Sequence, residues 1–488
     1  RIFIMKLQHI LLKVNVVKIL GDKNKEITNI NFNSKKITKN GLFVAIRGLV
    51  ADGHDYIDNS IKSGASVIFA EILPKKIHKD ITYVCVKNTH RSLSQLASIF
   101  YNYPSKSIRL IGVTGTNGKT TIVSLLHQLF SLLNRKSGMI STIENKIIDK
   151  VIPSTHTTPD PLQINSLLSK MVDAECEYCF MEVSSHALHQ ERVADLSFDG
   201  GVFTNITNDH LDYHTTFSEY RDVKKSFFDS LSAETFALVN KDDKNSTKML
   251  ETTKAKKITY ALKSMADFNC KVIEGHFDGM LLMINNFSVW VKLIGDFNAY
   301  NLLSVYAVAK LYRFADSDIL TALSMLDSAE GRLQFLKNQN SIIGIVDYAH
   351  TEDALKNALI TIKNLKTNSQ KLVTIIGCGG NRDKSKRPFM TKVACQYSSV
   401  VILTSDNPRF EDPDLIISDM LSDLNANQKE KVLSINNRKQ AIMTAGKLVT
   451  KDDIIFLAGK GHEKYQEIKG KKLPFDDVIE LKKSLNII

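Results

Sequence analysis

The stretch Ile108-Arg-Leu-Ile-Gly-Val-Thr-Gly-Thr-Asn-Gly-Lys-Thr-Thr121 decides the architecture of this 488-residue chain. Its first half is typical of a buried strand, and a helical pattern follows from about Thr120 to Leu133. A glycine-rich turn between strand and helix presents backbone N–H groups at the positive helix end, where proteins bind phosphates. We therefore predict a phosphate-binding loop, with Lys119 near the terminal phosphates and Thr120 near Mg²⁺. An ordinary tight turn is the alternative.

The composition indicates a large globular chain. It is 43% hydrophobic and 24% charged, and at this length about two to four packed domains are expected. No run reaches the roughly eighteen uncharged apolar residues of a membrane helix, and lysines interrupt the apolar opening. Six scattered cysteines suit a reducing compartment. We expect a cytoplasmic protein without membrane insertion.

The net charge of +12 raises nucleic-acid binding as an alternative. The basic residues are mostly lysines, scattered without a basic block or an interleaved aromatic stripe. A solvated lysine-rich surface accounts for them, and a mild basic bias also suits an enzyme with anionic substrates. We therefore expect no nucleic-acid partner.

Changes in pattern divide the chain into three sections, which we expect to be three domains of an α/β protein. The first section, residues 1–106, mixes short strands with one helix near 89–101. The central section, residues 107–331, holds the phosphate loop, further buried strands and two late helices. This pattern predicts a central parallel sheet like that of P-loop ATPases.

The last section, residues 332–488, alternates strand and helix, which is the βαβ pattern of a Rossmann-like parallel sheet. Ligands bind at the carboxyl ends of the strands in such sheets. The polar clusters of this section follow its strands, at Asp347–His350, Gly379–Asp383, Asp406–Arg409 and Gly459–Glu463. Four loops at one edge of a sheet predict one binding site.

A carboxylate and an imidazole follow two strands of the central section. Glu182 comes near the end of the apolar run at 179–183, and His210 follows the run at 200–207. Near a phosphate loop, the two side chains could hold a second Mg²⁺. The alternative is a pair of ordinary hydrogen-bonded residues at strand ends.

The loop at 114–121 is similar to the nucleotide loop of the Mur ligase family, ATP-dependent enzymes that build the peptide stem of peptidoglycan. Further motifs follow in the family's order along nearly the whole chain. The resemblance implies that ATP and Mg²⁺ are cofactors, and Asn298 and Asn301, three apart on one helical face, could hydrogen-bond adenine. The implied ATP-binding residues are Thr114, Gly115, Thr116, Asn117, Gly118, Lys119, Thr120, Asn298, Asn301, Arg332 and Asp347.

The resemblance also implies a modified lysine. In this family a lysine four residues after a tyrosine, here Lys224 after Tyr220, carries a carbamate that binds metal. Its neighbour Lys225 would point about 100° away on a helix. The implied metal ligands are Thr120, Glu182, His210 and carbamylated Lys224. The implied catalytic residues are Lys119, Lys224, His210 and His350, with His350 contacting an acyl phosphate.

Two segments resemble the nucleotide-sugar site of the MurE branch of this family. The resemblance implies that the first section is a UDP-binding domain. The family usually has Asp-Ser-Arg around the serine that matches Ser34, so Asn33 and Lys35 depart from that pattern. The implied substrate is UDP-N-acetylmuramoyl-L-alanyl-D-glutamate. Its implied contacts are Ser34, Thr157, Thr158, Ser184, Gln190 and Arg192.

The sequence Asp-Asn-Pro-Arg at 406–409 matches the members that add meso-diaminopimelate. This amino acid differs from lysine by a distal carboxylate, which the planar guanidinium of Arg409 can bind bidentately. A surface arginine in a turn is the alternative. The implied diaminopimelate contacts are Arg387, Asp406, Asn407, Pro408, Arg409, Gly459 and Glu463, with Glu463 pairing with an ammonium.

The resemblance implies an amide-bond ligase that works through an acyl phosphate and acts as a monomer. Two siblings with the same chemistry stay open, a lysine-adding ligase and folylpolyglutamate synthetase. A nucleotide-binding regulator without catalysis belongs to a different class, and it would be expected to lack Lys224, His210 or Arg409.

Overall fold

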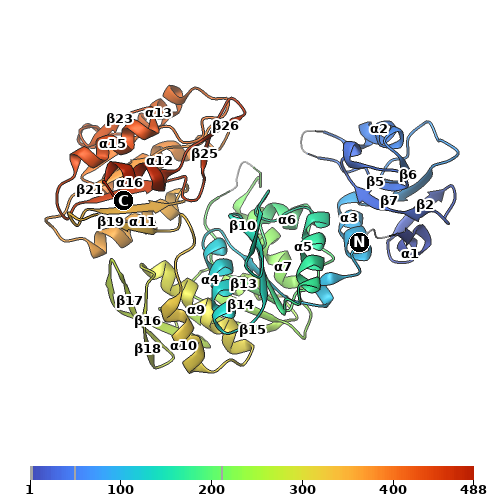
Figure 1. Ribbon diagram of the computed structural model, residues 1–488, viewed down its shortest axis with the longest axis horizontal. Coiled ribbons are helices and arrows are strands. Elements are labelled where there is room, and N and C mark those ends of the chain that lie inside the picture. The colour runs from blue at the N-terminus through green and yellow to red at the C-terminus, as the bar shows by residue number, and fades with distance from the viewer. Residues whose placement is uncertain (1–3, 49–50, 210–212, 488) are drawn as a thin grey trace.

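The computed structural model describes residues 4–48, 51–209 and 213–487, arranged in three lobes that follow the chain (Figure 1). Each lobe is built around its own β-sheet with helices packed against it. The α/β fold class is therefore confirmed. Within the described residues, no helix is both long enough and apolar enough to cross a membrane.

The first lobe holds a five-stranded sheet in the order β2-β7-β6-β5-β4, parallel except for β2. The expected helix near 89–101 is present, and the Asn88 side chain accepts a hydrogen bond from Arg91 N (2.9 Å) at its start. The strands are β1 (Met5–Lys6), β2 (Val16–Leu20), β3 (Glu26–Ile27), β4 (Asn29–Asn31), β5 (Gly41–Val44), β6 (Ala65–Ala70) and β7 (Thr82–Val86), and the helices are α1 (Leu7–Leu11), α2 (Ile57–Lys62) and α3 (Thr89–Phe100).

The central lobe holds an eleven-stranded sheet in the order β11-β10-β9-β12-β8-β13-β14-β15-β16-β17-β18. The strands are β8 (Arg109–Thr114), β9 (Ser137–Ile140), β10 (Glu144–Ile147), β11 (Lys150–Pro153), β12 (Tyr178–Glu182), β13 (Gly200–Phe203), β14 (Phe236–Asn240), β15 (Lys256–Ala261), β16 (Phe268–His276), β17 (Gly279–Ile284) and β18 (Phe287–Val291). The helices are α4 (Lys119–Leu132), α5 (Pro161–Asp173), α6 (Ser185–His189), α7 (Phe217–Asp229), α8 (Ser246–Met249), α9 (Asp296–Leu311) and α10 (Asp316–Met325).

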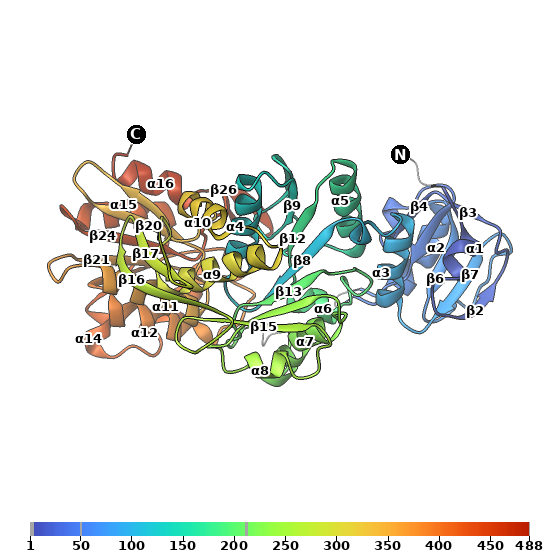
Figure 2. The same cartoon turned by 90° about the horizontal axis from the view of Figure 1, so that it is seen from below.

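The middle of the central sheet is parallel, as expected, but both of its edges are antiparallel. The strands β10 and β11 extend one edge, and β17 and β18 extend the other. Helices cover both faces, with α4 and α9 on one side and α5, α6 and α7 on the other (Figure 2). Because β8 lies between β12 and β13, the loop after β8 starts beside Glu182 and Phe203.

The last lobe holds a six-stranded sheet in the order β19-β20-β24-β21-β22-β23, parallel except for β19. The expected Rossmann-like alternation is therefore confirmed. The strands are β19 (Gln334–Lys337), β20 (Ile343–Asp347), β21 (Leu372–Ile376), β22 (Val400–Leu403), β23 (Val432–Ser434), β24 (Ile454–Ala458), β25 (Tyr465–Ile468) and β26 (Lys471–Pro474). The helices are α11 (Glu352–Leu365), α12 (Lys386–Tyr397), α13 (Pro413–Leu421), α14 (Ala426–Lys429), α15 (Arg438–Leu448) and α16 (Asp477–Ser484).

A fully buried ion pair connects α15 to α16, which both pack against this sheet. Arg438 donates from Nε and Nη2 to the two carboxylate oxygens of Asp477, at 2.7 and 2.6 Å. The same Nη2 reaches the carbonyl of Ala458 at the end of β24 (3.2 Å). The pair therefore anchors the strand that leads into the Gly459–Glu463 loop.

We expect Asp477→Asn to lower the local free energy of unfolding of β24 by roughly 3 to 5 kcal/mol, because it leaves a buried guanidinium without its counter-ion. Native-state hydrogen exchange of the β24 amides measures this loss. Lys439→Ala breaks an exposed pair between the same two helices, at 3.6 Å from Glu480, and should cost at most about 0.5 kcal/mol. Equal losses in the two variants would contradict the anchoring role.

Candidate active site

The loop predicted to bind phosphate joins β8 to α4, with the strand before it and the helix after it as expected. Gly118 has a φ of 90° at the start of α4, and a Cβ there would lie 2.8 Å from Asn301 Oδ1. Lys119 folds over the loop, and its Nζ donates to the carbonyls of Gly115 (2.9 Å) and Thr116 (2.8 Å). Burial lowers the pKa of Lys119. The loop therefore holds a partly buried amine against its own backbone.

Two residues after β13 support the loop from behind, and the sequence analysis did not single them out. Asn205 accepts from the backbone N–H groups of Thr116 (2.8 Å, through its carbonyl) and Asn117 (2.9 Å, through its side chain). Thr204 Oγ1 donates to the Asn117 carbonyl at 2.7 Å. Their only signal in the sequence is a position just after a buried strand beside the loop.

Lys224 reaches this loop from α7 and is 1% exposed. Its Nζ donates to the Gly115 carbonyl at 3.0 Å and lies 4.8 Å from the centre of the Tyr220 ring. Lys225 instead turns away and pairs with Asp229 at 2.7 Å. Burial, with the nearby charge of Lys119 as the second cause, lowers the pKa of Lys224 well below its usual value. Of the two neighbouring lysines, Lys224 is the one that the fold places at the loop.

Glu182 lies at the end of β12 and is fully buried. Its carboxylate accepts from the backbone N–H (2.7 Å) and the hydroxyl (3.1 Å) of Thr142. His210, the other predicted ligand from this region, lies outside the described residues. Among the described residues, no group of three or more His, Cys, Asp or Glu side chains could hold a metal ion. The oxygen donors Glu182 and Thr120 fit the ligand chemistry of Mg²⁺.

A cavity of about 600 Å³ opens between the phosphate loop, α9 and the last lobe. Arg332 crosses this junction, with Nη2 3.3 Å from Thr120 Oγ1 and its guanidinium 4.7 Å from the centre of the Tyr348 ring. Asp347 is held by the N–H groups of Leu333 (2.7 Å) and Ala349 (2.8 Å). The lining includes six predicted nucleotide residues, the predicted catalytic His350 and one residue that the sequence analysis missed: Asn117, Gly118, Asn298, Asn301, Arg332 and Asp347, then His350, and lastly Asp353.

Asp353 and His350 face this cavity from the last lobe. Asn117 Nδ2 donates to Asp353 Oδ2 at 3.2 Å, which gives a second contact across the junction. His350 Nδ1 lies 2.8 Å from the Tyr348 carbonyl. Desolvation, and next the charge of Lys386, lower the pKa of His350 to about 4. The lowered pKa favours the neutral ring. Because a carbonyl only accepts, a neutral ring in this contact carries its proton on Nδ1 and leaves Nε2 as an acceptor.

Five predicted nucleotide-sugar contacts come together beside Glu182. Arg192 donates to the Thr158 carbonyl at 2.7 Å and to Gln190 Oε1 at 2.7 and 3.1 Å. Ser184 N donates to Thr158 Oγ1 (3.0 Å), and Thr157 Oγ1 lies 3.1 Å from Thr142 Oγ1.

The sixth predicted contact, Ser34, lies in the first lobe. It begins a short 3₁₀ turn (Ser34–Lys36), where Asn33 Oδ1 accepts from Lys35 N at 3.0 Å. Helix α3 links this lobe to the segment after α6, through Ser94 to the Glu191 carbonyl and through Ser98 to the Asp195 carbonyl (3.2 Å).

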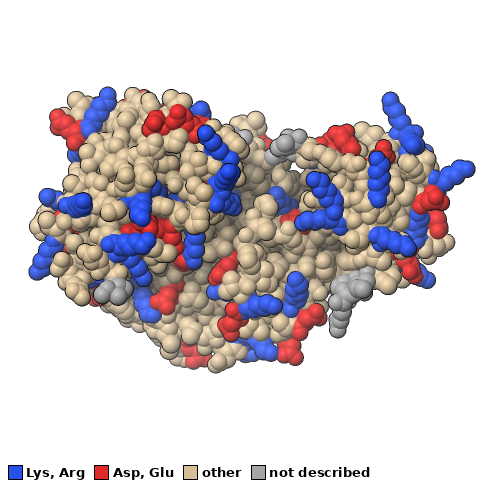
Figure 3. Space-filling model, turned by 45° about the horizontal axis from the view of Figure 1, so that its top comes forward, with Lys and Arg blue, Asp and Glu red and all other residues tan. Residues whose placement is uncertain are grey.

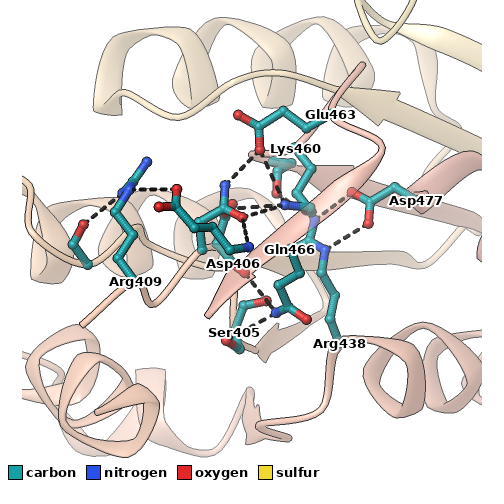
Figure 4. Close-up of polar contacts among 12 residues, drawn as sticks. Ser405, Asp406, Arg409, Arg438, Lys460, Glu463, Gln466 and Asp477 are labelled. Carbon is teal, nitrogen blue, oxygen red and sulfur yellow. Dashed lines mark hydrogen bonds and ion pairs between the residues drawn. The ribbon is translucent and has the colours of Figure 1, made fainter. Parts of the chain in front are cut away.

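The predicted amino-acid site is a dense polar cluster at the carboxyl ends of β22 and β24 (Figure 4). Its centre is Lys460, a fully buried cation that the sequence analysis did not single out. Lys460 Nζ lies 3.0 Å from Asn407 Oδ1, 3.2 Å from Glu463 Oε2 and 3.8 Å from Asp406 Oδ1. Burial, and next the charge of Asp406, raise the pKa of Glu463. Gly459 has a φ of 115°, and a Cβ there would lie 2.6 Å from Asp406 Oδ2.

Arg387 and Arg409 lie in different surroundings at this edge. Arg387 is fully buried on α12 and already bonded to Asp419 (2.7 Å) and to both carboxylate oxygens of Glu411 (3.1 Å each). Arg409 follows the buried Pro408 and is about one-fifth exposed. Arg409 is therefore better placed than Arg387 to meet a ligand carboxylate.

Comparison with known proteins assigns the chain to a family. Three family models match in succession: the Mur ligase family catalytic domain at residues 26–101, the Mur ligase middle domain at 113–309, and the Mur ligase glutamate ligase domain at 331–461. The chain belongs to the Mur ligase family.

Relatives that match along the full length include proteins named UDP-N-acetylmuramoyl-L-alanyl-D-glutamate–2,6-diaminopimelate ligase. The protein of that name from Cytophaga hutchinsonii is 48% identical over 99% of this chain and 100% of its own. The one from Bacteroides fragilis is 47% identical over the same shares.

Solved structures give the same result at the level of fold. A structure with that name is 29% identical and superimposes with a TM-score of 0.70 over 99% of both chains. A folylpolyglutamate synthase from Mycobacterium tuberculosis in complex with ADP is 16% identical, with a TM-score of 0.63 over 77% of this chain and 92% of its own. The second likeness concerns the fold alone.

We expect Lys224→Met to raise the free energy of unfolding over wild type by more at about pH 7 than at about pH 10. The lowered pKa means that folded Lys224 loses its proton before the unfolded chain does. Unfolding therefore takes up a proton between the two pKa values, and the wild type loses stability as pH falls through that window. Urea unfolding in carbon-dioxide-free buffer measures the difference.

Lys225→Met is the matched control for this pH experiment, because Lys225 turns away from the loop and pairs with Asp229 at 2.7 Å. The rise in the free energy of unfolding between about pH 10 and pH 7 should be larger for Lys224→Met than for this control. If Lys224→Met raised the free energy of unfolding by the same amount at both pH values, folded Lys224 would have to keep its proton over this range. That result would contradict its lowered pKa.

Proposed function

We propose that this Mur ligase joins the amine of meso-diaminopimelate to the D-glutamate side-chain carboxylate of UDP-N-acetylmuramoyl-L-alanyl-D-glutamate, at the expense of ATP. One observation carries the proposal. The loop at 114–121 and the polar cluster around Lys460 lie on two neighbouring lobes, and Arg332 connects these lobes, with its Nη2 3.3 Å from Thr120 Oγ1. The name of these relatives supports the same substrates.

ATP occupies the cavity between the loop and the last lobe in this proposal. The loop from Thr114 to Thr120 holds its phosphates by backbone N–H groups, with Lys119 near the terminal ones. Asn298 and Asn301 meet the adenine, and their place in the cavity supports this. Arg332, ordered by Tyr348, adds positive charge where the two lobes meet.

Lys224 carries a carbamate in the working enzyme. Only a neutral amine combines with carbon dioxide, and the lowered pKa of Lys224 supplies that form. The reaction gives an N-carboxylate and releases one proton, which converts a buried base into an oxygen ligand. With Thr120, Glu182 and His210, this carboxylate would hold Mg²⁺, which supplies positive charge to the transferring phosphoryl group.

The reaction proceeds in two steps. A carboxylate oxygen of D-glutamate attacks the γ-phosphorus of ATP, ADP leaves, and an acyl phosphate forms. The neutral amine of diaminopimelate then attacks the carbonyl carbon, and the tetrahedral intermediate loses phosphate to give the amide. Lys119 and Arg332 stabilise the charge on the phosphoryl oxygens. Since His350 Nε2 is an acceptor, the ring can meet a donor such as the amine or a protonated phosphate oxygen.

The three lobes act as three domains with boundaries near 106 and 331, and the enzyme works as a monomer. The first domain binds the UDP group through Ser34. The muramoyl dipeptide meets five residues of the central domain: Thr157, Thr158, Ser184, Gln190 and Arg192. The hydrogen bonds from α3 to the segment after Gln190 support one substrate site that continues from the first domain into the central domain. Lys and Arg side chains are scattered over the face seen in Figure 3, which supports anionic small molecules rather than nucleic acid as partners.

We expect wild-type enzyme with ATP and the UDP-linked dipeptide to release phosphate with meso-diaminopimelate at least about 100-fold faster than with L-lysine. The distal carboxylate is what Arg409 would bind, and lysine lacks it. A coupled phosphate assay with each amino acid, and with none, measures this ratio. Equal rates with lysine would keep the ligase and remove the acceptor assignment, whereas no release with either amino acid would contradict the proposed function.

A further inference from the structure

A β-hairpin forms hydrogen bonds with the Asp406–Arg409 loop. Strands β25 and β26 form the hairpin, and Arg409 pairs with it in a bridge to Ile468. Arg409 N donates to the Glu467 carbonyl (3.0 Å), and Lys469 N donates to the Arg409 carbonyl (2.7 Å). Arg409 has a φ of 54°, a left-handed conformation that is unfavourable for a side chain of this size. The hairpin bonds stabilise this backbone.

The Arg409 side chain is held on two sides. Its Nε lies 3.3 Å from Glu467 Oε2, and its Nη1 donates to the Gly380 carbonyl at 2.7 Å. Within the described part of the chain, Nη2 makes no hydrogen bond. Because Arg409 is 22% exposed and Glu467 25% exposed, the pair lies at the mouth of the site. The guanidinium is thus oriented before any ligand carboxylate arrives.

The same hairpin fixes two further residues of the loop. Glu467 N donates to Asn407 Oδ1 at 2.9 Å, and Gln466 Nε2 donates to the Asp406 carbonyl at 2.7 Å. Asn407 in turn bonds Glu463 Oε2 at 2.7 Å. Glu467 therefore acts on Asn407 and on the Arg409 backbone through its own backbone, and on the Arg409 side chain through its carboxylate. Only the action on the side chain depends on its charge.

We propose that Glu467 is a positioning residue, whose carboxylate orients the Arg409 guanidinium toward the distal carboxylate of the incoming amino acid. This inference rests on the proposed function. An arginine side chain has four rotatable bonds, and ordering them during binding costs affinity. A counter-ion that orders them beforehand increases the affinity for the amino acid and leaves the chemical step unchanged.

Glu467→Gln tests the proposal, because it keeps the backbone bonds and the side-chain shape but removes the charge. We expect KM for meso-diaminopimelate to rise about fivefold, the effect of losing one partly exposed ion pair. The kcat and the KM for ATP should stay within about twofold, since neither depends on Arg409 in this proposal. Lys471→Ala, an exposed change on the same hairpin, is the control and should behave as wild type.

A double-mutant cycle separates positioning of Arg409 from a direct or purely structural role. In an Arg409→Ala background, Glu467→Gln should leave kcat/KM for meso-diaminopimelate unchanged, because the side chain that it orients is gone. An undiminished effect in that background would overturn the proposal. An unchanged KM for meso-diaminopimelate in the single variant would also overturn it. So would a fall in kcat and a rise in the KM for ATP that are as large as the rise in the KM for meso-diaminopimelate. Absence of turnover in the wild type would instead contradict the proposed function.

Discussion

Two lysines, the partly buried Lys119 and the buried Lys224, share one carbonyl oxygen, and the chemistry of the whole site depends on that arrangement. Lys119 Nζ lies 2.9 Å and Lys224 Nζ 3.0 Å from the oxygen of Gly115. Burial of Lys224 is the first cause of its lowered pKa, and repulsion between two ammonium groups so close together is the second. The site therefore favours anions at the loop, and converting one of the amines into a carboxylate relieves the repulsion.

The sheet topology determines which groups meet the two lysines. Because β12, β8 and β13 run parallel side by side, Glu182, the phosphate loop and Asn205 all lie at one edge. The last lobe presents the carboxyl edge of its own sheet to the same junction, through Arg332 to Thr120 and Asp353 to Asn117. A nucleotide and an amino acid bound at two such edges face a common region, which suits a reaction with an intermediate passed between them.

The parallel core and the phosphate loop follow from local patterns and could be predicted from the sequence. The antiparallel strands β16 to β18 could not be expected from alternating strands and helices, although Asn285 and Asn286, both with positive φ, mark their turn. The position of Lys224 rather than Lys225 came from the family resemblance, and the fold explains it by burial. Lys460, Asn205 and Glu467 were missed because their roles depend on partners far away in sequence. Arg387 was identified without its two carboxylate partners for the same reason.

The acyl phosphate is tested most directly by following the oxygen atoms of the D-glutamate side-chain carboxylate. If the carboxylate attacks ATP, one of its oxygens must leave with the phosphate when the amide forms. With oxygen-18 in that carboxylate, mass spectrometry should find one labelled oxygen in each released phosphate. Unlabelled phosphate would contradict the acyl phosphate, and with it the assignment of the loop and the amino-acid cluster to one reaction.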